Sequence, residues 1–270
     1  MEFSLATIHR DSISGKLYPR ARTCIFRNFW SQIPLHHSAK EAMETACGRN
    51  TKKETYGDRD NDNRRSHHNL CGAINEKVFS SDLFTFTTDV RMAKVSDLTS
   101  LDGNPGADVE AVFWIKPSST QWRVKGKAFV IGGDPKDEVE QRARREIQKG
   151  MRQQYPSSEE SIQAWSWEKE ITAQFANLNP LMRGSFRNPP PGTIRSTPDS
   201  DYHQKLKLGQ KVDSPWDEVA RSNFRVVVIK PEDVEMVDLT APDAALRVRW
   251  KLTDGLDDRG TGWKREDLWP

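Results

Sequence analysis

The sequence predicts a mainly β protein, built as an antiparallel barrel with helical additions. At least six segments have the pattern of strands, against three or four that have the pattern of helices. Strands and helices do not alternate regularly, which argues against a doubly wound parallel sheet. The clearest strand is Gln121–Ile131, where polar residues at every second position face one side and mostly apolar residues face the other.

β-forming residues mark the other predicted strands in order along the chain. They are Glu2–Ile8, Arg22–Phe29, Asp82–Thr88, Asp108–Ile115, Asn223–Lys230, a short strand that ends at Leu239, and candidate final strands at Leu246–Leu252 and Trp263–Pro270. A turn-rich connection holding Gly15 and Pro19 separates the first two strands, so these are expected to form a hairpin.

Three segments have helical patterns. Val139, Ala143, Ile147 and Met151 recur at four-residue spacing and predict an amphipathic helix within Pro135–Tyr155. A second helix is predicted over Ser158–Leu178 and a short one over Met92–Leu101. The Pro-, Gly- and Ser-rich stretch Arg183–Ser214 predicts a loop.

Residues 44–69 contain no Val, Ile, Leu or Phe. Such a segment buries too little apolar surface to offset the conformational entropy lost on ordering. The sequence therefore predicts a single domain over residues 1–270 with a disordered insertion at 31–75, and residues 44–69 are expected to be dispensable for folding.

Composition limits the protein class. Lys and Arg number 41 against 39 Asp and Glu, and this net charge of +2 argues against a general nucleic-acid binder. The three cysteines form no paired framework and fit a reducing compartment. The chain shows neither a secretory signal nor an apolar run of about 18 residues, so a cytoplasmic, non-membrane protein is expected.

Metal binding is a weak alternative. Cys47, His67, His68 and Cys71 lack the spacing of paired zinc ligands, and they lie in a polar segment. No metal site is therefore predicted.

Three strand-like segments combine β-formers with basic or amide side chains. They are Arg22–Arg27, Phe84–Lys94 and Gln121–Lys127. Taken alone, their arginines and lysines fit the solvent side of ordinary strands. The last of them, with its tryptophan and basic residues, also leaves open a barrel that binds nucleic acid.

In this order, the three segments resemble the flavin-binding strands of the pyridoxamine 5′-phosphate oxidase-like split β-barrel family. The stretches from Trp165 to Glu168, from Asn179 to Phe186 and from Pro189 to Gly192 resemble its cyanobacterial and fungal FMN-binding subgroup. The ending Trp263–Pro270 resembles the oxidase C-terminus. The resemblance implies an FMN-binding split barrel, with FMN at the interface of a homodimer.

The resemblance also implies cofactor-binding residues. Arg22 and Arg27 match the basic ends of the first flavin strand, and Thr87 and Thr88 match the strand end that faces the flavin. Lys94 matches a lysine that follows, and Arg91 is expected to replace the arginine that the family often has at the position of Ala93. Gln121 matches the glutamine that opens the third strand. Arg249 is added as a C-terminal candidate.

The implied activity is that of a flavoprotein oxidoreductase similar to pyridoxamine 5′-phosphate oxidase, with a non-catalytic or regulatory flavin-binding protein as the alternative. The oxidases hold the substrate phosphate with a Tyr, Arg and Ser group and use an Arg-x-His near the C-terminus. Neither has a clear counterpart here, because Arg247 and Arg249 lack a following histidine. Catalytic residues and substrate are left open.

Overall fold

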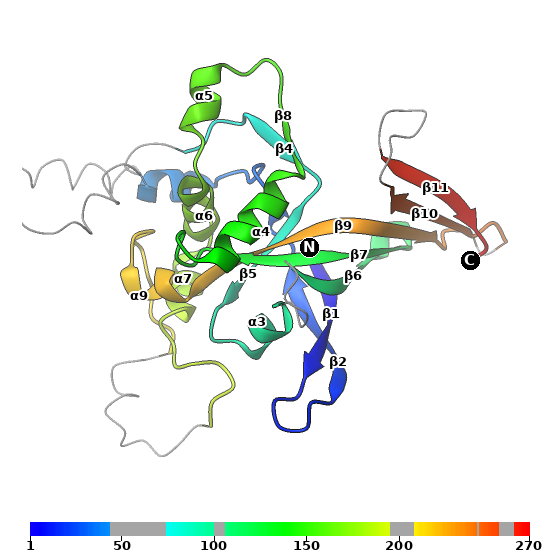
Figure 1. Ribbon diagram of the computed structural model, residues 1–270, viewed down its shortest axis with the longest axis horizontal. Coiled ribbons are helices and arrows are strands. Elements are labelled where there is room, and N and C mark those ends of the chain that lie inside the picture. Colours follow the sequence, from blue (N-terminus) through cyan, green and yellow to red (C-terminus); the bar gives the residue numbers. More distant parts are fainter. Residues whose placement is uncertain (44–73, 100–105, 195–207, 242, 254–261) are drawn as a thin grey trace, which may run out of the picture.

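The computed structural model describes residues 1–43, 74–99, 106–194, 208–241, 243–253 and 262–270. Within these ranges an antiparallel sheet of nine strands forms the centre of the molecule (Figure 1). Its strands are β1 (Glu2–Arg10), β2 (Leu17–Ile25), β3 (Asn28–Phe29), β5 (Phe84–Asp89), β6 (Ala107–Ile115), β7 (Thr120–Ile131), β9 (Phe224–Asp238), β10 (Leu246–Leu252) and β11 (Trp263–Leu268). A separate pair joins β4 (Phe79–Ser81) to β8 (Met151–Gln153).

Strand β9 is the branch point of the sheet. One of its edges pairs with β7 along nearly its whole length. The other edge pairs with β5 over Phe224–Ile229 and with β10 over Asp233–Asp238. The sheet therefore divides along β9 into a barrel side, which carries β5, and an arm formed with β10 and β11, which protrudes from the body in Figure 1.

The helices lie mainly on one side of this sheet (Figure 1). They are α3 (Ala93–Asp97), the 3₁₀ turn η1 (Lys116–Ser118), α4 (Glu138–Gln148), α5 (Glu159–Ala164), α6 (Trp167–Ala176), α7 (Pro180–Ser185) and α9 (Glu218–Asn223). Four of them begin at a residue whose side chain accepts a bond from the first turn: Asp137, Ser158, Asn179 and Asp217. Such caps satisfy backbone N–H groups that have no partner inside the helix.

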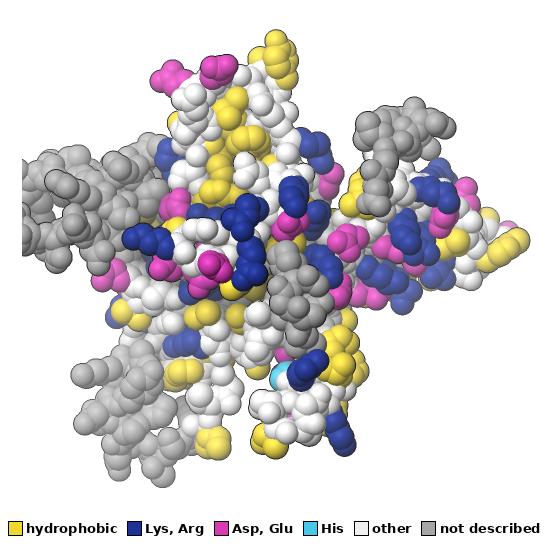
Figure 2. Space-filling view, viewed as in Figure 1, with side chains coloured by type: hydrophobic (Ala, Val, Ile, Leu, Met, Phe, Trp, Pro, Cys, Tyr) yellow, Lys and Arg dark blue, Asp and Glu magenta, His cyan; other side chains and the backbone are white. Residues whose placement is uncertain are grey.

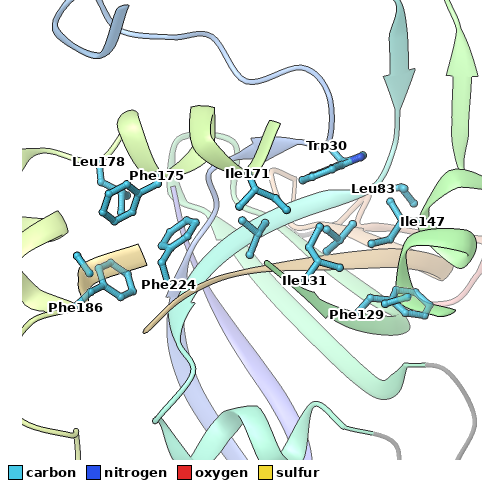
Figure 3. Close-up of a cluster of buried hydrophobic side chains, with 14 residues drawn as sticks. Trp30, Leu83, Phe129, Ile131, Ile147, Ile171, Phe175, Leu178, Phe186 and Phe224 are labelled. Atoms are coloured by element: carbon cyan, nitrogen blue, oxygen red, sulfur yellow. The ribbon is translucent and has the colours of Figure 1, made fainter. Parts of the chain in front are cut away.

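Alternation along β9 builds two hydrophobic cores. Val227 and Ile229 point into the barrel, where they join a cluster with Phe84 and Phe86. Val226 and Val228 point to the opposite side and pack under the helices. Figure 3 shows this second core, which brings together aromatic residues of α6, the segment after α7, and β9. A strand buried on both faces explains the continuous apolar run Val226–Ile229.

A β-bulge lies where the arm leaves the barrel side of the sheet. The register between β7 and β9 shifts between Lys125 and Gly126, opposite Pro231. A Cβ at Gly126 would lie 2.0 Å from the backbone oxygen of Lys230, so the close approach of the two strands requires glycine here. A bulge increases local bend and twist, and here it sets the direction of the arm.

The strand predictions agree with the structure in order and differ in extent. The predicted strand Arg22–Phe29 is two strands, because the chain turns between Ile25 and Asn28 to pair first with β1 and then with β5. The two strands predicted at Asn223–Lys230 and up to Leu239 form the single strand β9, which continues through Pro231 over 15 residues. Proline is tolerated there because the bulge interrupts the ladder.

The helix predictions were too long. The helix predicted to reach Tyr155 ends at Gln148, and β8 follows after Gly150. The helix predicted over Ser158–Leu178 is broken into α5 and α6, where the backbone N–H of Ser166 donates to Asn75 Oδ1 instead of continuing the helix. The predicted loop after Arg183 begins within α7.

Part of the predicted insertion is ordered. Residues 37–43 are helical, and buried Ala39 and Met43 pack against Ala176 of α6. Residues 44–73, including the stretch expected to be dispensable, lie outside the described residues. The prediction of one domain over the whole chain stays a prediction. Among the described segments, no helix combines the length and the apolar character that crossing a bilayer would need.

Candidate functional site

A polar cluster around Asp97 joins α3 to the β1–β2 hairpin. The Asp97 carboxylate accepts hydrogen bonds from Thr7 Oγ1 at 3.2 Å and Arg22 Nη2 at 2.9 Å, and His9 Nδ1 lies 2.7 Å from it. Arg22 Nη1 donates to Thr7 Oγ1 at 2.8 Å. Strand register brings these residues together, since Thr7, His9 and Arg22 share one face of the hairpin. Arg22, expected to bind cofactor, is therefore anchored by a buried carboxylate.

Lys94 lies one helical turn before Asp97 and has a different environment. Its ammonium nitrogen sits 5.9 Å from the centre of the Phe86 ring, in cation–π contact. Among the described residues it forms no ion pair with a carboxylate. Burial lowers the pKa of Lys94, because desolvation disfavours the charged form, and the nearby charge of Arg22 lowers it further. Lys94 is thus a partly desolvated cation that could accept an anionic ligand.

Arg27 occupies the connection between β2 and β3. Its backbone N–H donates to the oxygen of Thr85, which places the residue beside β5. Its guanidinium lies 4.0 Å from Met182 Sδ, and its Nε is buried without a hydrogen-bond partner. Burial lowers the pKa of Arg27 as well. A buried guanidinium nitrogen without an acceptor is costly, so Arg27 is a second candidate for an anion or a carbonyl edge.

Thr87 and Thr88 lie near the end of β5, as the sequence indicated, and point to opposite faces. Thr88 is buried, and its hydroxyl lies 3.4 Å from the oxygen of Asp89 and 3.6 Å from Met92 Sδ. Thr87 is half-buried. Thr87 is therefore the more accessible of the two side chains.

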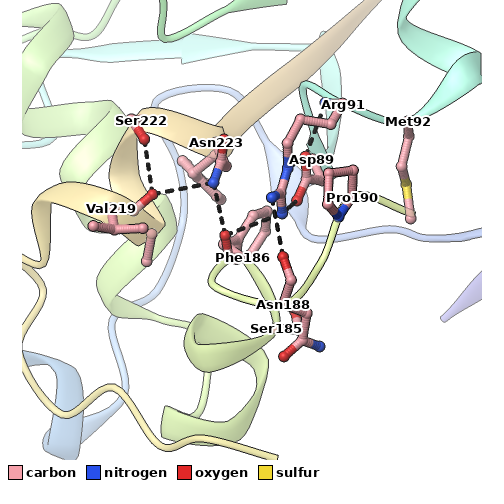
Figure 4. A network of polar contacts seen from close by, with 12 residues as sticks. Asp89, Arg91, Met92, Ser185, Phe186, Asn188, Pro190, Val219, Ser222 and Asn223 are labelled. Atoms are coloured by element: carbon pink, nitrogen blue, oxygen red, sulfur yellow. Dashed lines mark hydrogen bonds and ion pairs between the residues drawn. The ribbon is translucent and has the colours of Figure 1, made fainter. Parts of the chain in front are cut away.

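Arg91 holds two loops together. Its Nε donates to Asp89 Oδ1 at 2.9 Å and its Nη2 to Asp89 Oδ2 at 2.6 Å. Its guanidinium also donates to the backbone oxygens of Asn188 and Phe186, at 3.0 and 3.2 Å. Figure 4 shows this network, in which Asn223 bonds the same oxygen of Phe186. Arg91 therefore does not present a free guanidinium to a phosphate, because its donors already hold the turn after β5 against the segment after α7.

Gln121 and Arg249 lie at the other end of the sheet. Gln121 pairs with Val237 of β9, whereas Thr88 pairs with Arg225 at the opposite end of the same strand. Twelve residues of extended strand span roughly 40 Å. Arg249, on β10, forms an ion pair with the Asp233 carboxylate. One chain therefore does not bring Gln121 or Arg249 to the part of β5 that lies beside Lys94.

Asp97, Thr7 and His9 were not predicted as site residues. The three-residue spacing from Lys94 to Asp97 indicates neighbouring positions on a helix. The alternation of Thr7 and His9 indicates one face of a strand. Only the packing of α3 on the β1–β2 hairpin shows that Asp97 of the helix meets Thr7 and His9 of the strand.

The cysteine and histidine residues weighed as metal ligands, namely Cys47, His67, His68 and Cys71, lie outside the described residues. Within the parts of the chain that the structure does describe, His, Cys, Asp and Glu form no group of three or more that could hold a metal ion. The buried thiol of Cys24 lies near Lys94 and Arg22, and burial raises its pKa.

Sequence comparison relates the first half of the chain to known proteins. Residues 1–132 match the family profile described as pyridoxamine 5′-phosphate oxidase, FMN-binding domain. This range holds all the predicted site residues except Arg249. The protein YGR017W of Saccharomyces cerevisiae, itself uncharacterized, is 28% identical over 115 residues, which make up 43% of this chain and 33% of that protein. The chain thus matches about a third of the length of this relative.

Structural comparison extends the likeness to the fold as a whole. A pyridoxamine 5′-phosphate oxidase-related, FMN-binding protein from Nostoc punctiforme PCC 73102 aligns with a TM-score of 0.53 and 17% identity, covering 100% of this chain and 88% of that one. PhzG from Burkholderia lata 383 gives a TM-score of 0.46 at 11% identity, with 99% and 81% covered, too low to support an argument. The predicted mainly antiparallel, split-barrel type of fold is confirmed. Residues 1–132 are thus similar to the FMN-binding domain of the pyridoxamine 5′-phosphate oxidase family.

Proposed function

We propose that the protein binds FMN, with the flavin phosphate near Lys94. One observation carries this proposal: Lys94 is a partly buried ammonium with no carboxylate partner among the described residues. It lies within residues 1–132, which match the FMN-binding domain profile. A phosphate would supply the missing anion and form charge-assisted hydrogen bonds, which are roughly twice as strong as neutral ones.

The surrounding residues fit different parts of such a ligand. Arg22, fixed by Asp97 and Thr7, adds positive charge beside Lys94. Arg27 has an unpartnered buried Nε that suits a carbonyl or phosphate oxygen, and Thr87 offers a half-buried hydroxyl near the end of β5. Arg91 does not fit the role of phosphate ligand, since its guanidinium binds Asp89 and two backbone oxygens.

We further propose that the site is completed by a second copy of the chain. Gln121 and Arg249 lie roughly 40 Å of strand away from Thr88, so they could serve the same flavin only from a partner subunit. The outward face of the β1–β2 hairpin carries small exposed side chains at its centre, namely Ser4, Ala6, Ala21 and Thr23. Ser4 pairs with Val112 of β6, and the half-exposed Trp114 extends this face to Gln121. Such a face suits a homodimer interface.

The proposed activity is that of a flavin-dependent oxidoreductase. The bound flavin would supply the redox chemistry, and the protein would contribute position and electrostatics. The substrate is not pyridoxine 5′-phosphate by this proposal, because the sequence lacks clear counterparts of the phosphate-binding groups of the oxidases. The second candidate function is non-catalytic flavin binding, which the same residues support.

Reconstitution with FMN followed by desalting tests the proposal. We expect a yellow protein with quenched flavin fluorescence and about one FMN per chain. Lys94→Ala should weaken FMN binding about tenfold or more and leave riboflavin binding nearly unchanged, because riboflavin lacks the phosphate. Lys136→Ala, which removes an exposed lysine from the turn after β7, is the matched control. A colourless desalted protein would refute flavin binding.

Substrate assays on the FMN-loaded protein separate the activities. Oxygen-dependent formation of pyridoxal 5′-phosphate with kcat/KM of about 10⁴ M⁻¹s⁻¹ or more would contradict the proposal and indicate the oxidase activity. Reduction of the flavin by a nicotinamide cofactor without vitamin B6 turnover would support a reductase. Flavin binding without either reaction favours the non-catalytic candidate.

A further inference from the structure

The carboxylate of Asp97 divides its two oxygens between a histidine and an arginine. His9 Nδ1 lies 2.7 Å from Oδ1, and Arg22 Nη2 donates to Oδ2 at 2.9 Å. The Asp97 side chain is 1% exposed, so little water reaches it. Among the described residues, His9 is the one hydrogen-bond partner of Oδ1. Loss of His9 would therefore leave a buried carboxylate oxygen without a donor, which is costly.

The bond to Asp97 fixes the tautomer of His9. An ionised carboxylate only accepts hydrogen bonds, so the single N–H of the neutral imidazole lies on Nδ1. Nε2 of the neutral ring is then an acceptor and cannot donate to a phosphate oxygen. Neutral His9 can therefore act on an anionic ligand only through Asp97, and not by direct contact.

Asp97 and Thr7 fix the guanidinium of Arg22 with two bonds. Nη2 donates to Asp97 Oδ2, and Nη1 donates to Thr7 Oγ1, which in turn donates to the same Oδ2. A guanidinium has five N–H groups, so three remain without an acceptor among the described residues. Lys94 is a neighbouring cation, since burial lowers its pKa and the charge of Arg22 lowers it further. A fixed Arg22 beside Lys94 offers a phosphate two cations at once.

Ion pairs on the arm have a simpler environment. Arg265 pairs with Asp267 two residues along β11, and both side chains are half or more exposed. Figure 2 shows basic and acidic side chains interspersed over the protruding strands. Water and neighbouring charges compensate such surface pairs, so they need no third residue. The buried set at Asp97 instead draws its donors from two strands, β1 and β2, and places them against α3.

We propose that His9 is a positioning residue that gives the site its preference for phosphorylated over unphosphorylated flavin. This role rests on the proposed binding of FMN and extends it to a residue that does not touch the ligand. His9 holds Asp97, Asp97 holds Arg22, and Arg22 presents its remaining N–H groups to the phosphate. Riboflavin lacks the phosphate, so its affinity does not depend on His9.

Titration of the full-length chain with FMN and with riboflavin tests this role. His9→Phe keeps a ring and removes the donor, so we expect FMN affinity to fall about tenfold and riboflavin affinity to stay unchanged. His9→Asn places an amide nitrogen near the position of Nδ1 and should keep FMN affinity within about threefold of the parent. His37→Phe is the matched control, because the His37 side chain is 96% exposed.

The outcomes separate the role of His9 from flavin binding itself. Equal losses for FMN and riboflavin in His9→Phe would overturn the role, and so would a His9→Asn protein as weak as His9→Phe. A parent that binds FMN while His9→Phe binds it equally well refutes the role of His9 alone. A parent that binds neither flavin refutes both proposals.

The parent protein also allows a test that needs no variant, which matters if His9→Phe fails to fold. Long-range ¹H–¹⁵N NMR at pH 8 reports which ring nitrogen of His9 carries the proton. We expect the Nδ1–H tautomer, as the bond to Asp97 requires. An Nε2–H tautomer would exclude that bond and overturn the proposal.

Discussion

Buried charged side chains in this protein differ in whether another side chain compensates their charge. Asp97 is buried but accepts bonds from Thr7 and Arg22, so its ionised form is compensated. Lys94 and Arg27 are partly desolvated without a carboxylate partner in the described ranges, which leaves them available to a ligand. Glu170 on α6 is a buried acid: burial raises its pKa to about 7, although the amide of Asn75 and the backbone N–H of Ser31 act in the opposite direction.

The raised pKa of Glu170 predicts a pH-dependent stability. The folded protein keeps the carboxyl protonated up to about pH 7, whereas the unfolded chain releases the proton near pH 4.5. The free energy of unfolding should therefore fall as pH rises from about 4.5 to 7, by about 3 kcal/mol in total. Glu170→Gln should remove this slope and make the protein more stable than the parent at pH 8. Urea unfolding at pH 5, 6, 7 and 8 measures the effect.

Glu168, two residues earlier, is the control, because its pKa is shifted in the opposite direction. Burial alone would raise its pKa, but the hydrogen bond and charge of Arg144 lower it on balance. Its contribution to stability is present at neutral pH and is lost as pH falls below its usual range. Glu168→Gln should therefore destabilise the protein at pH 7. A Glu170→Gln protein with the same pH slope as the parent would contradict the account of Glu170.

Replacement of Arg91 tests its role in holding the loops together. Arg91→Lys keeps the charge but loses the forked contacts to Asp89 and to the backbone oxygens of Phe186 and Asn188. We expect a loss of about 1–3 kcal/mol in the free energy of unfolding. FMN and riboflavin affinities should change by the same factor, because Arg91 does not contact the phosphate. Thermal melting and flavin titration measure the two effects.

Arg152→Lys is the matched control for Arg91. Arg152 also forms a forked pair, with Asp82, but both partners are exposed. Surface pairs of this kind contribute about 1 kcal/mol or less. A selective loss of FMN affinity in Arg91→Lys, with riboflavin unaffected, would restore Arg91 as a phosphate ligand.

At the scale of elements, the bulge between β7 and β9 sets the geometry of the arm. Gly126→Ala would place a Cβ 2.0 Å from the backbone oxygen of Lys230, so the strands would have to separate. We expect destabilisation of about 2 kcal/mol or more. Intrinsic tryptophan fluorescence should also change, because the stacked Trp122 and Trp250 lie on the two sides of the displaced ladder. Chemical unfolding followed by fluorescence measures both.

Gly133→Ala serves as the control for the bulge. Its Cβ would lie 3.4 Å from Glu140 Oε2, the far end of a side chain that can shift by a few tenths of an ångström. A change within about 1 kcal/mol is expected. Equal costs for the two substitutions would show that the close approach at Gly126 does not determine the arm.

At the scale of the whole molecule, the separation of Gln121 from Lys94 predicts a dimer. Ala21→Arg places a large charged side chain among the small residues of the outward face of the hairpin, where Ala21 is exposed in the single chain. The isolated chain should fold normally, whereas pairing through this face would bury the arginine without a partner. We expect a shift from dimer to monomer and a loss of FMN affinity. Light scattering after size-exclusion chromatography measures the first, and flavin titration the second.

Val139→Arg on α4 is the control for this substitution, because Val139 is exposed on a helix away from the hairpin. It should change neither the molecular mass nor the flavin affinity. A parent protein that is monomeric at micromolar concentration would contradict the proposal that a second copy of the chain completes the flavin site.

Local sequence patterns determined which segments form strands and which helices, and in what order. The alternation in Gln121–Ile131, the apolar run within Phe224–Lys230 and the four-residue spacing of Ala143 and Ile147 each reflect burial on one or both sides of an element. Because burial of apolar side chains drives folding, these patterns are present in the chain itself.

Tertiary structure decided how far elements extend and which charges are free. Helix α5 ends where the backbone N–H of Ser166 meets Asn75, and β9 passes Pro231 only because a bulge absorbs it. The sequence placed Arg22, Arg91 and Lys94 together as equivalent cations. An ion pair of Arg22 with Asp97 on α3, and one of Arg91 with Asp89 two residues earlier, then distinguished them from Lys94. Which charge pairs with which depends on strand register and helix packing, and these arise only when distant segments meet.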